Sequence, residues 1–210
     1  MDLDNSRAAQ LYYRVLEKYV CPRIEVLGLR PNGVSLLGLG LAVLVPLGFW
    51  LAAILGVLLM GLSAVADGLD GYLARQRKEK TRFGAFLDST LDRAADFFYL
   101  LGFWVYSISL GSGSLWFTLC IFLALLATLL ISYSKARIEG LGGRCAIGLM
   151  HRAPRTLYLL AWGILLVLLP PLRVYLLWIG ILVYLLLTLA TVWQRVRLAA
   201  VILDQEEESV

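Results

Sequence analysis

Long uncharged stretches separated by short charged ones are the main pattern along this chain. No charged side chain occurs in residues 31–66, 97–134, 156–172 and 174–194. Because a bilayer core accommodates about 20 apolar residues per helix, the first two stretches are too long for one span each. Breaks near Pro46-Leu47-Gly48 and in the SLGSGS segment, residues 109–114, divide them. The pattern then predicts six helical spans, at 33–49, 51–74, 84–107, 115–136, 154–171 and 174–194.

The segment before the first span has an amphipathic pattern instead. Apolar residues recur at helical spacing from Ala8 to Tyr19, while Arg7, Arg14 and Lys18 occupy other positions. This spacing predicts a helix that lies in the membrane interface. At the other end of the chain, the sequence LDQEEESV predicts a solvated acidic tail.

The composition supports a membrane setting. The 210 residues are 60% hydrophobic and 16% charged, and the mean hydropathy of +0.79 is too high for a soluble domain of this length. The predicted fold class is therefore an all-α integral membrane protein, with six transmembrane helices and an N-terminal interfacial amphipathic helix.

The distribution of positive charge predicts the orientation. Of the 19 Lys and Arg residues, 18 fall on one side of the six-span arrangement, and only Arg173 falls on the other. Positively charged loops stay in the cytoplasm, so both termini should be cytoplasmic in a multi-pass protein of the cell (plasma) membrane. The expected organisation is a cytoplasmic juxtamembrane segment at 1–32, a six-helix transmembrane domain at 33–197 and an acidic cytoplasmic tail at 198–210.

Four aspartates stand at the ends of hydrophobic segments, within the stretch DGLDGYLARQRKEKTRFGAFLDSTLD that begins at Asp67. Asp67 and Asp70 are three residues apart. Asp88 and Asp92 are four apart, so in helices each pair projects from a single face. Two facing helices would bring four carboxylates together near the membrane boundary, where they need cations or protons. All-oxygen ligation selects hard divalent ions such as Mg²⁺ or Mn²⁺. The competing interpretation is that the aspartates form ordinary interfacial salt bridges with Arg75, Arg77 and Arg93.

Small residues interleave with these acids, and Arg75 follows the first pair. Gly and Ala let helices and ligands approach the backbone closely, and an arginine can grip phosphate oxygens bidentately. Mg²⁺ is commonly held by a few carboxylates together with substrate phosphates. The stretch therefore predicts a nucleotide or pyrophosphate that lies across the helix ends.

Eight positions in this stretch resemble the CDP-alcohol phosphatidyltransferase family. They fit its pattern D-x2-D-G-x2-A-R-x8-G-x3-D-x3-D position for position, at Asp67, Asp70, Gly71, Ala74, Arg75, Gly84, Asp88 and Asp92. The six spans, the interfacial helix and Pro31-Asn32 before the first span are also similar to that family. The resemblance covers nearly the whole chain except the acidic tail.

This resemblance implies a transferase of phospholipid biosynthesis that acts on a CDP-linked lipid in the bilayer. Asp67, Asp70 and Asp88 would hold Mg²⁺ or Mn²⁺ on the pyrophosphate. Asp92 would help to ligate the metal and act as the general base when an acceptor hydroxyl displaces CMP. The CDP moiety would be lined by Gly71, Ala74, Arg75 and Gly84. The family also implies a homodimer, and no nucleic-acid partner is expected.

A second group of charges bears on the acceptor. SYSKAR, residues 132–137, closes the fourth predicted span, and HRAPR, residues 151–155, opens the fifth. Their cations could form one pocket for an acceptor phosphate, composed of Lys135, Arg137, Arg152 and Arg155. The alternative is that these charges only set the topology.

The SYxKAR pattern, the sequence DSTLDRAAD with its further acid Asp96, and the spacing of the two arginines resemble the phosphatidylinositol-phosphate synthase branch, including its archaeal-lipid relatives. In that branch the acceptor is a polyol phosphate, inositol phosphate. His151 and Ala153-Pro154 depart from its pattern, which leaves glycerol 3-phosphate, the acceptor of phosphatidylglycerophosphate synthase, as the main rival. A cation transporter is the non-enzyme alternative. It predicts acids at mid-bilayer in broken helices, whereas the acids of this sequence lie next to a basic loop at one membrane boundary.

Overall fold

The computed structural model describes residues 31–76 and 81–207, with side chains for 31–73 and 81–202. The helices are α3 (Pro31–Leu51), α4 (Ala53–Gln76), α5 (Arg82–Ser109), α6 (Leu115–Gly140), α7 (Arg152–Leu168), the 3-10 turn η3 (Pro170–Leu172) and α8 (Arg173–Glu207). These ranges contain no strand, which confirms the all-helical prediction for them. The predicted interfacial helix before residue 31 lies outside them.

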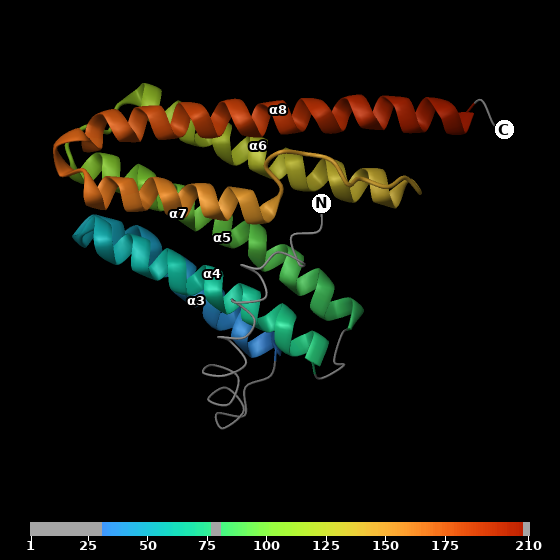
Figure 1. Ribbon diagram of the computed structural model, residues 1–210, viewed down its shortest axis with the longest axis horizontal. Helices are drawn as coiled ribbons and strands as arrows, with labels where there is room; N and C mark the ends of the chain where they lie inside the picture. The colour runs from blue at the N-terminus through green and yellow to red at the C-terminus, as the bar shows by residue number, and fades with distance from the viewer. Residues whose placement is uncertain (1–30, 77–80, 208–210) are drawn as a thin grey trace.

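The helices form an elongated bundle with two groups, joined by α7 and by the packing of α5 on α6 (Figure 1). α3, α4 and α5 pack together, α6 packs along α8, and α7 contacts both α4 and α8. Successive helices run in opposite directions, so the C-terminal end of α4 and the N-terminal ends of α5 and α7 lie at the same end of the bundle. The C-terminal end of α6 and the long extension of α8 lie at that end as well. Residues from α4, α5 and α7 can therefore meet there.

A reversal at a single residue joins α3 to α4. Only Ala52 separates the two helices, and Pro46 lies inside α3. The break that the sequence predicts at Pro46-Leu47-Gly48 is therefore found a few residues later, because membrane helices tolerate an internal proline. The two helices approach closely at two glycines, where a Cβ on Gly48 would lie 2.9 Å from the Gly56 nitrogen. Small residues at this contact let the chain reverse without a loop.

A buried hydrogen-bond chain fixes α3, α4 and α5 relative to one another. The Tyr99 hydroxyl donates to Ser63 Oγ at 2.8 Å, and Ser63 Oγ donates to the Gly38 carbonyl at 2.7 Å. Gly38 also permits close packing beside the turn of α4 that carries Asp67, since a Cβ there would lie 3.2 Å from the Ala66 Cβ. The start of the aspartate motif is thus held against α3.

Aromatic packing sets the position of α7. The Phe103 ring of α5 stacks on Trp162 of α7 with ring centroids 3.9 Å apart, and Phe49 of α3 packs on Phe103 at 5.0 Å. Trp162 Nε1 donates a hydrogen bond to the Leu176 carbonyl of α8 at 2.8 Å. A Cβ on Gly180 would lie 2.1 Å from the Trp162 ring, so α8 can approach only with a glycine there. These contacts fix the direction in which the N-terminal residues of α7 point.

Four of the described helical segments are long and apolar enough to cross a membrane: Pro31–Leu51, Ala53–Leu73, Leu115–Gly140 and Pro170–Ile202. These four candidate spans agree with the predicted membrane setting of the chain. α5 and α7 are not among these four segments. The first half of α5 carries several charged residues, and α7 is only 17 residues long. α8 continues to Glu207, so the predicted acidic tail begins inside a helix.

Candidate active site

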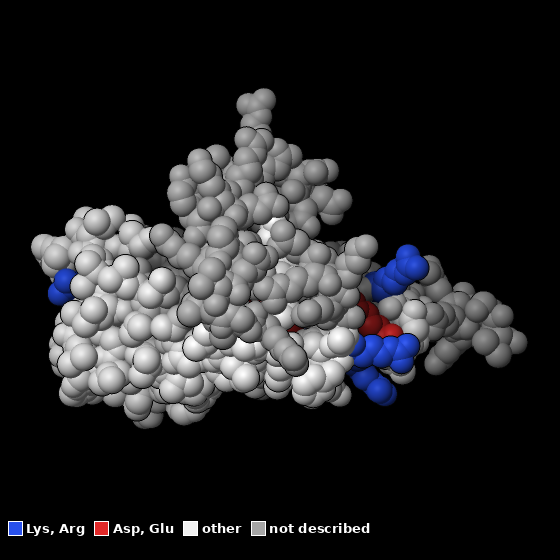
Figure 2. All heavy atoms as spheres, turned by 90° about the horizontal axis from the view of Figure 1, so that it is seen from below, with Lys and Arg blue, Asp and Glu red and all other residues white. Residues whose placement is uncertain are grey.

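Charged residues gather at the end of the bundle where α4, α5 and α7 meet. Figure 2 shows acidic atoms flanked by Lys and Arg at this end. The first turn of α5 is fixed by a helix cap, in which Thr81 Oγ1 accepts a hydrogen bond from the Gly84 N–H at 2.9 Å. This cap satisfies an N–H that has no partner within the helix. It orders the turn that precedes Asp88.

Three aspartates of the motif converge from two helices. One carboxylate oxygen from each of Asp67, Asp70 and Asp88 lies within 4.8 Å of the others. Asp70 is only 4% exposed, and a carboxylate taken out of water needs a compensating cation. An all-carboxylate donor set with this spacing fits a hard divalent ion such as Mg²⁺ or Mn²⁺. These three residues are the ones that could hold it.

The acids of α5 form a stripe that runs from the surface into the bundle. Asp88, Asp92 and Asp96 follow one another at intervals of four residues, and their side chains are 46%, 10% and 5% exposed. The cluster is therefore open to solvent at Asp88 and closed at Asp96. A charged substrate group can reach the outer two acids more easily than the third.

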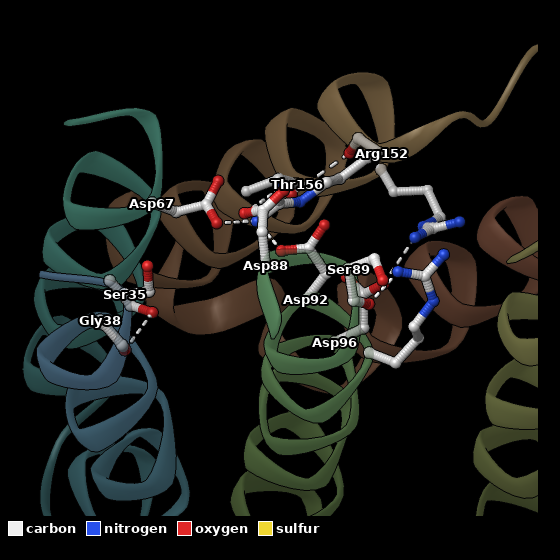
Figure 3. A network of polar contacts seen from close by, with 12 residues as sticks. Ser35, Gly38, Asp67, Asp88, Ser89, Asp92, Asp96, Arg152 and Thr156 are labelled. Carbon is white, nitrogen blue, oxygen red and sulfur yellow. Dashed lines mark hydrogen bonds and ion pairs between the residues drawn. The ribbon is translucent and has the colours of Figure 1, made fainter. Parts of the chain in front are cut away.

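Arg152, the first residue of α7, lies among the carboxylates (Figure 3). Its guanidinium donates a hydrogen bond to Asp67 and forms an ion pair with Asp92. Its Nη1 is 3.7 Å from Asp88 Oδ1. The Arg152 side chain is 35% exposed, so the cluster shields it only in part from solvent.

A second ion pair lies deeper. Arg155 Nη2 is 2.6 Å from Asp96 Oδ2, and both residues are 3% exposed. Arg155 is one helical turn after Arg152, so α7 presents two guanidiniums to the acid stripe of α5. The Arg155 Nε is buried without a hydrogen-bond partner among the described residues. The pair joins α5 to α7 directly beneath the cluster.

The other predicted site residues are placed as follows. Lys135 is exposed on the last turns of α6, with its Nζ 3.8 Å from Glu139 Oε1, and Arg137 is exposed nearby. Two of the four predicted acceptor cations therefore contact the carboxylates, and the other two remain on α6. Gly71 and Gly84 are partly buried in α4 and α5. Ala74 and Arg75 belong to α4, but their side chains lie outside the described part of the chain.

One buried arginine has a structural contact that sequence reasoning missed. Arg195 of α8, counted above only as a topological charge, is 4% exposed and donates hydrogen bonds to the carbonyls of Ile131 and Ile147. Nearby, Thr191 Oγ1 accepts a hydrogen bond from the Met150 N–H at 3.0 Å. These contacts hold the 141–151 connection against α8. The sequence does contain a sign of this buried contact, because Thr188, Thr191 and Arg195 form a polar stripe at helical spacing in an apolar helix.

The fold and the site together define a helical membrane protein with a carboxylate centre for a divalent cation at one end of its bundle. A model of the CDP-alcohol phosphatidyltransferase family matches residues 29–189 of this chain. The chain therefore belongs to the CDP-alcohol phosphatidyltransferase family, as its motif predicts.

Comparisons with individual proteins agree with this assignment. The chain is 34% identical over 161 residues to the archaetidylinositol phosphate synthase of Methanothermobacter thermautotrophicus, an alignment that covers 76% of this chain and 78% of the relative. The fold is similar to two crystal structures of phosphatidylinositol phosphate synthase from Mycobacterium tuberculosis, at 26% identity. The structure with CDP-DAG bound gives a TM-score of 0.71 and covers 86% of this chain and 91% of that one. The structure with manganese and citrate gives 0.72, with coverage of 86% and 87%.

Family membership confirms several predictions. The protein is a transferase of phospholipid biosynthesis, which excludes the cation transporter. The converging aspartates and the manganese in the similar structure confirm the expectation of a divalent cation, Mg²⁺ or Mn²⁺. The arginine that pairs with these aspartates in the described part of the chain is Arg152, which the salt-bridge interpretation did not name.

Proposed function

We propose that this protein transfers a phosphatidyl or archaetidyl group from a CDP-linked lipid to inositol phosphate and releases CMP. The observation that carries this proposal is the meeting of two kinds of group at one end of the bundle. The carboxylates of α4 and α5 suit a metal and a pyrophosphate, and the two guanidiniums of α7 beside them suit a second anion. An acceptor that brings its own phosphate would use both. The similar proteins described above make inositol phosphate lipids with two different lipid backbones.

In this proposal, Asp67, Asp70 and Asp88 hold the divalent cation, with Asp92 as a further ligand. When bound, the cation neutralises charge on the pyrophosphate of the CDP-linked lipid. Asp92 accepts the proton of the acceptor hydroxyl as its oxygen bonds to the lipid-bearing phosphorus and the bond from that phosphorus to CMP breaks. Its position suits the role, because it lies one turn deeper than Asp88 and is nearly buried.

The CDP moiety is proposed to lie across the ends of α4 and α5. Gly71, Ala74 and Gly84 would leave room for it, because residues without bulky side chains allow close approach to the helix backbone. Arg75 would contact its phosphate oxygens. In support, Gly84 lies in the capped first turn of α5, next to the opening of the carboxylate cluster.

The acceptor phosphate is proposed to bind Arg152 and Arg155, with Lys135 and Arg137 at the end of α6 as further cations. The geometry favours the two arginines of α7, because both lie against the acids of α5. Lys135 and Arg137 are exposed at the same end of the bundle. They would need to turn toward the acceptor to contribute.

The membrane arrangement is part of the proposal. We place α5 and α7 in the bilayer as the two remaining spans, which gives six, with 1–32 as an interfacial cytoplasmic segment, 33–197 as the catalytic domain and 198–210 as the cytoplasmic tail. The active site and both termini then face the cytoplasm of the cell (plasma) membrane, because the charged end of the bundle carries the cations. A homodimer is proposed from the family resemblance alone.

An acceptor comparison tests this function. Purified protein in detergent is given CDP-diacylglycerol and, in separate reactions at equal concentration, inositol phosphate, glycerol 3-phosphate or free inositol. We expect inositol phosphate to be used far better than free inositol, because only the phosphate ester brings an anion that can form charge-assisted hydrogen bonds with the guanidiniums of α7. Preference for glycerol 3-phosphate would replace the acceptor but retain the basic site. Equal use of inositol and inositol phosphate would contradict the site itself.

A further inference from the structure

Arg152 contacts the same carboxylates that suit the divalent cation. Asp67 and Asp88 belong both to the converging trio and to the partners of Arg152. The guanidinium also reaches Asp92, so it bridges α4 and α5 from the start of a third helix (Figure 3). A single side chain therefore supplies positive charge at the point where three carboxylates meet.

The location is otherwise unfavourable for a cation. Arg152 is the first residue of α7, where the partial charge of the helix dipole is positive. Arg155 adds a second positive charge one turn away, and the Arg152 side chain has only about a third of its surface in solvent (35%). Attraction to the aspartates is thus what keeps Arg152 in this position. By the same reasoning, the aspartates are held close together because Arg152 neutralises part of their repulsion.

We propose that Arg152 is an exchangeable counter-ion, which occupies the aspartate cluster in the metal-free protein and is displaced when the divalent cation binds. The guanidinium and a divalent cation compete for Asp67 and Asp88, because each neutralises the same carboxylate charge and the two cations repel each other. Arg152 therefore weakens metal binding while it stabilises the metal-free cluster.

Displacement has a consequence for the acceptor, and this step rests on the proposed function. Once released, Arg152 is a free guanidinium beside the cluster, able to bind an anionic acceptor. An acceptor phosphate that holds Arg152 away from the aspartates would favour the metal-bound state. Because coupling between two ligands is reciprocal, metal and acceptor phosphate then strengthen each other's binding. Arg152 thereby acts as a positioning residue that links the two sites.

Manganese binding to the purified full-length protein tests the exchange without any measurement of activity. Mn²⁺ is titrated and the free ion is followed by electron paramagnetic resonance, for the wild type, Arg152→Gln and Arg144→Gln. Arg144 is an exposed cation in the 141–151 connection and serves as the matched control. We expect Arg152→Gln to bind Mn²⁺ about tenfold more tightly than the wild type, and Arg144→Gln to bind as the wild type does.

Two additions separate direct exchange from general electrostatics. At 1 M KCl the Debye length is about 3 Å, so a long-range effect of the lost charge disappears while direct competition persists. Addition of inositol phosphate should tighten Mn²⁺ binding to the wild type and leave Arg152→Gln unchanged. Arg152→Lys, which keeps the charge and loses the forked geometry, should bind Mn²⁺ with intermediate affinity even if the Gln variant is poorly folded.

The outcomes are distinguishable. Equal Mn²⁺ affinity of the wild type, Arg152→Lys and Arg152→Gln at high salt would overturn the exchange and leave the proposed metal site standing. Absence of Mn²⁺ binding by all variants, wild type included, would overturn both the exchange and the metal site of the proposed function.

Discussion

The buried ion pair between Asp96 and Arg155 offers a sharp test of how the site is held together. We expect either single substitution, Asp96→Asn or Arg155→Met, to destabilise the protein strongly, because each leaves an uncompensated charge inside the bundle. The double substitution should recover most of the lost stability, since it removes both charges at once. Activity should not recover with it, because Arg155 would no longer be present to receive the acceptor phosphate.

The magnitude follows from the burial and the distance. At 2.6 Å and an effective dielectric constant of about 20, the attraction between the two charges is about 6 kcal/mol. Desolvation of the two ions offsets most of it, so the net contribution of the intact pair is small. Loss of one partner leaves the desolvation cost of the other, and such losses are typically about 3–5 kcal/mol. For a chain of this length, that corresponds to a decrease in Tm of about 6–20 °C.

Thermal unfolding in detergent, followed by the accessibility of buried cysteine to a thiol-reactive dye, measures this effect. The matched control is the exposed pair on α6, in which Lys135 and Glu139 lie 3.8 Å apart and about half exposed. Removal of that pair, by Lys135→Met or Glu139→Gln, should change stability by no more than about 0.5 kcal/mol. If Asp96→Asn and Arg155→Met unfold at the same temperature as these controls, the assignment of a buried ion pair is wrong.

Three further predictions concern the chemistry and the packing. Asp92→Asn should lower turnover by about two orders of magnitude while CDP-lipid binding stays within a few-fold, and retained turnover would place the base elsewhere. Arg152→Ala should raise the acceptor KM by about tenfold or more, because a charge-assisted contact contributes about 1.5–3 kcal/mol. The KM for the CDP-linked lipid should change little. Equal changes in both KM values would argue against a role specific to the acceptor. Ser63→Ala should cost about 1–3 kcal/mol of stability, since it removes the partner of Tyr99 and of the Gly38 carbonyl, and an unchanged Tm would mean that this chain of hydrogen bonds does not hold α3 and α5.

Local patterns predicted much of this architecture. The uncharged runs located the helices to within a few residues at most boundaries, because burial in lipid requires both length and apolar character. The spacing of Asp67 with Asp70 and of Asp88 with Asp92 predicted two facing carboxylate pairs, since helical periodicity alone fixes the face on which each pair lies. The point of reversal between α3 and α4 was less predictable, because it depends on the close contact of Gly48 with Gly56.

The cation contacts could not be read from local patterns. Arg152 and Asp67 are 85 residues apart, and Arg155 and Asp96 are 59 apart. Whether these side chains meet depends on the rotation of α7 about its axis, which the packing of Trp162 on Phe103 and α8 determines. The sequence therefore identified the arginines as a group of cations, but only the packed structure shows that two of them lie on the acids.

The most direct test of the central claim is the identity of the lipid product and its dependence on metal. Purified protein is incubated with CDP-diacylglycerol and inositol phosphate, with Mg²⁺ or with EDTA, and the lipids and CMP are quantified by mass spectrometry; CDP-archaeol and the Asp88→Asn variant are run in parallel. The account predicts phosphatidylinositol phosphate and CMP in equal amounts with Mg²⁺, and neither product in EDTA or from Asp88→Asn. Undiminished product in EDTA, or release of CMP without an inositol phosphate lipid from either CDP-linked donor, would contradict it.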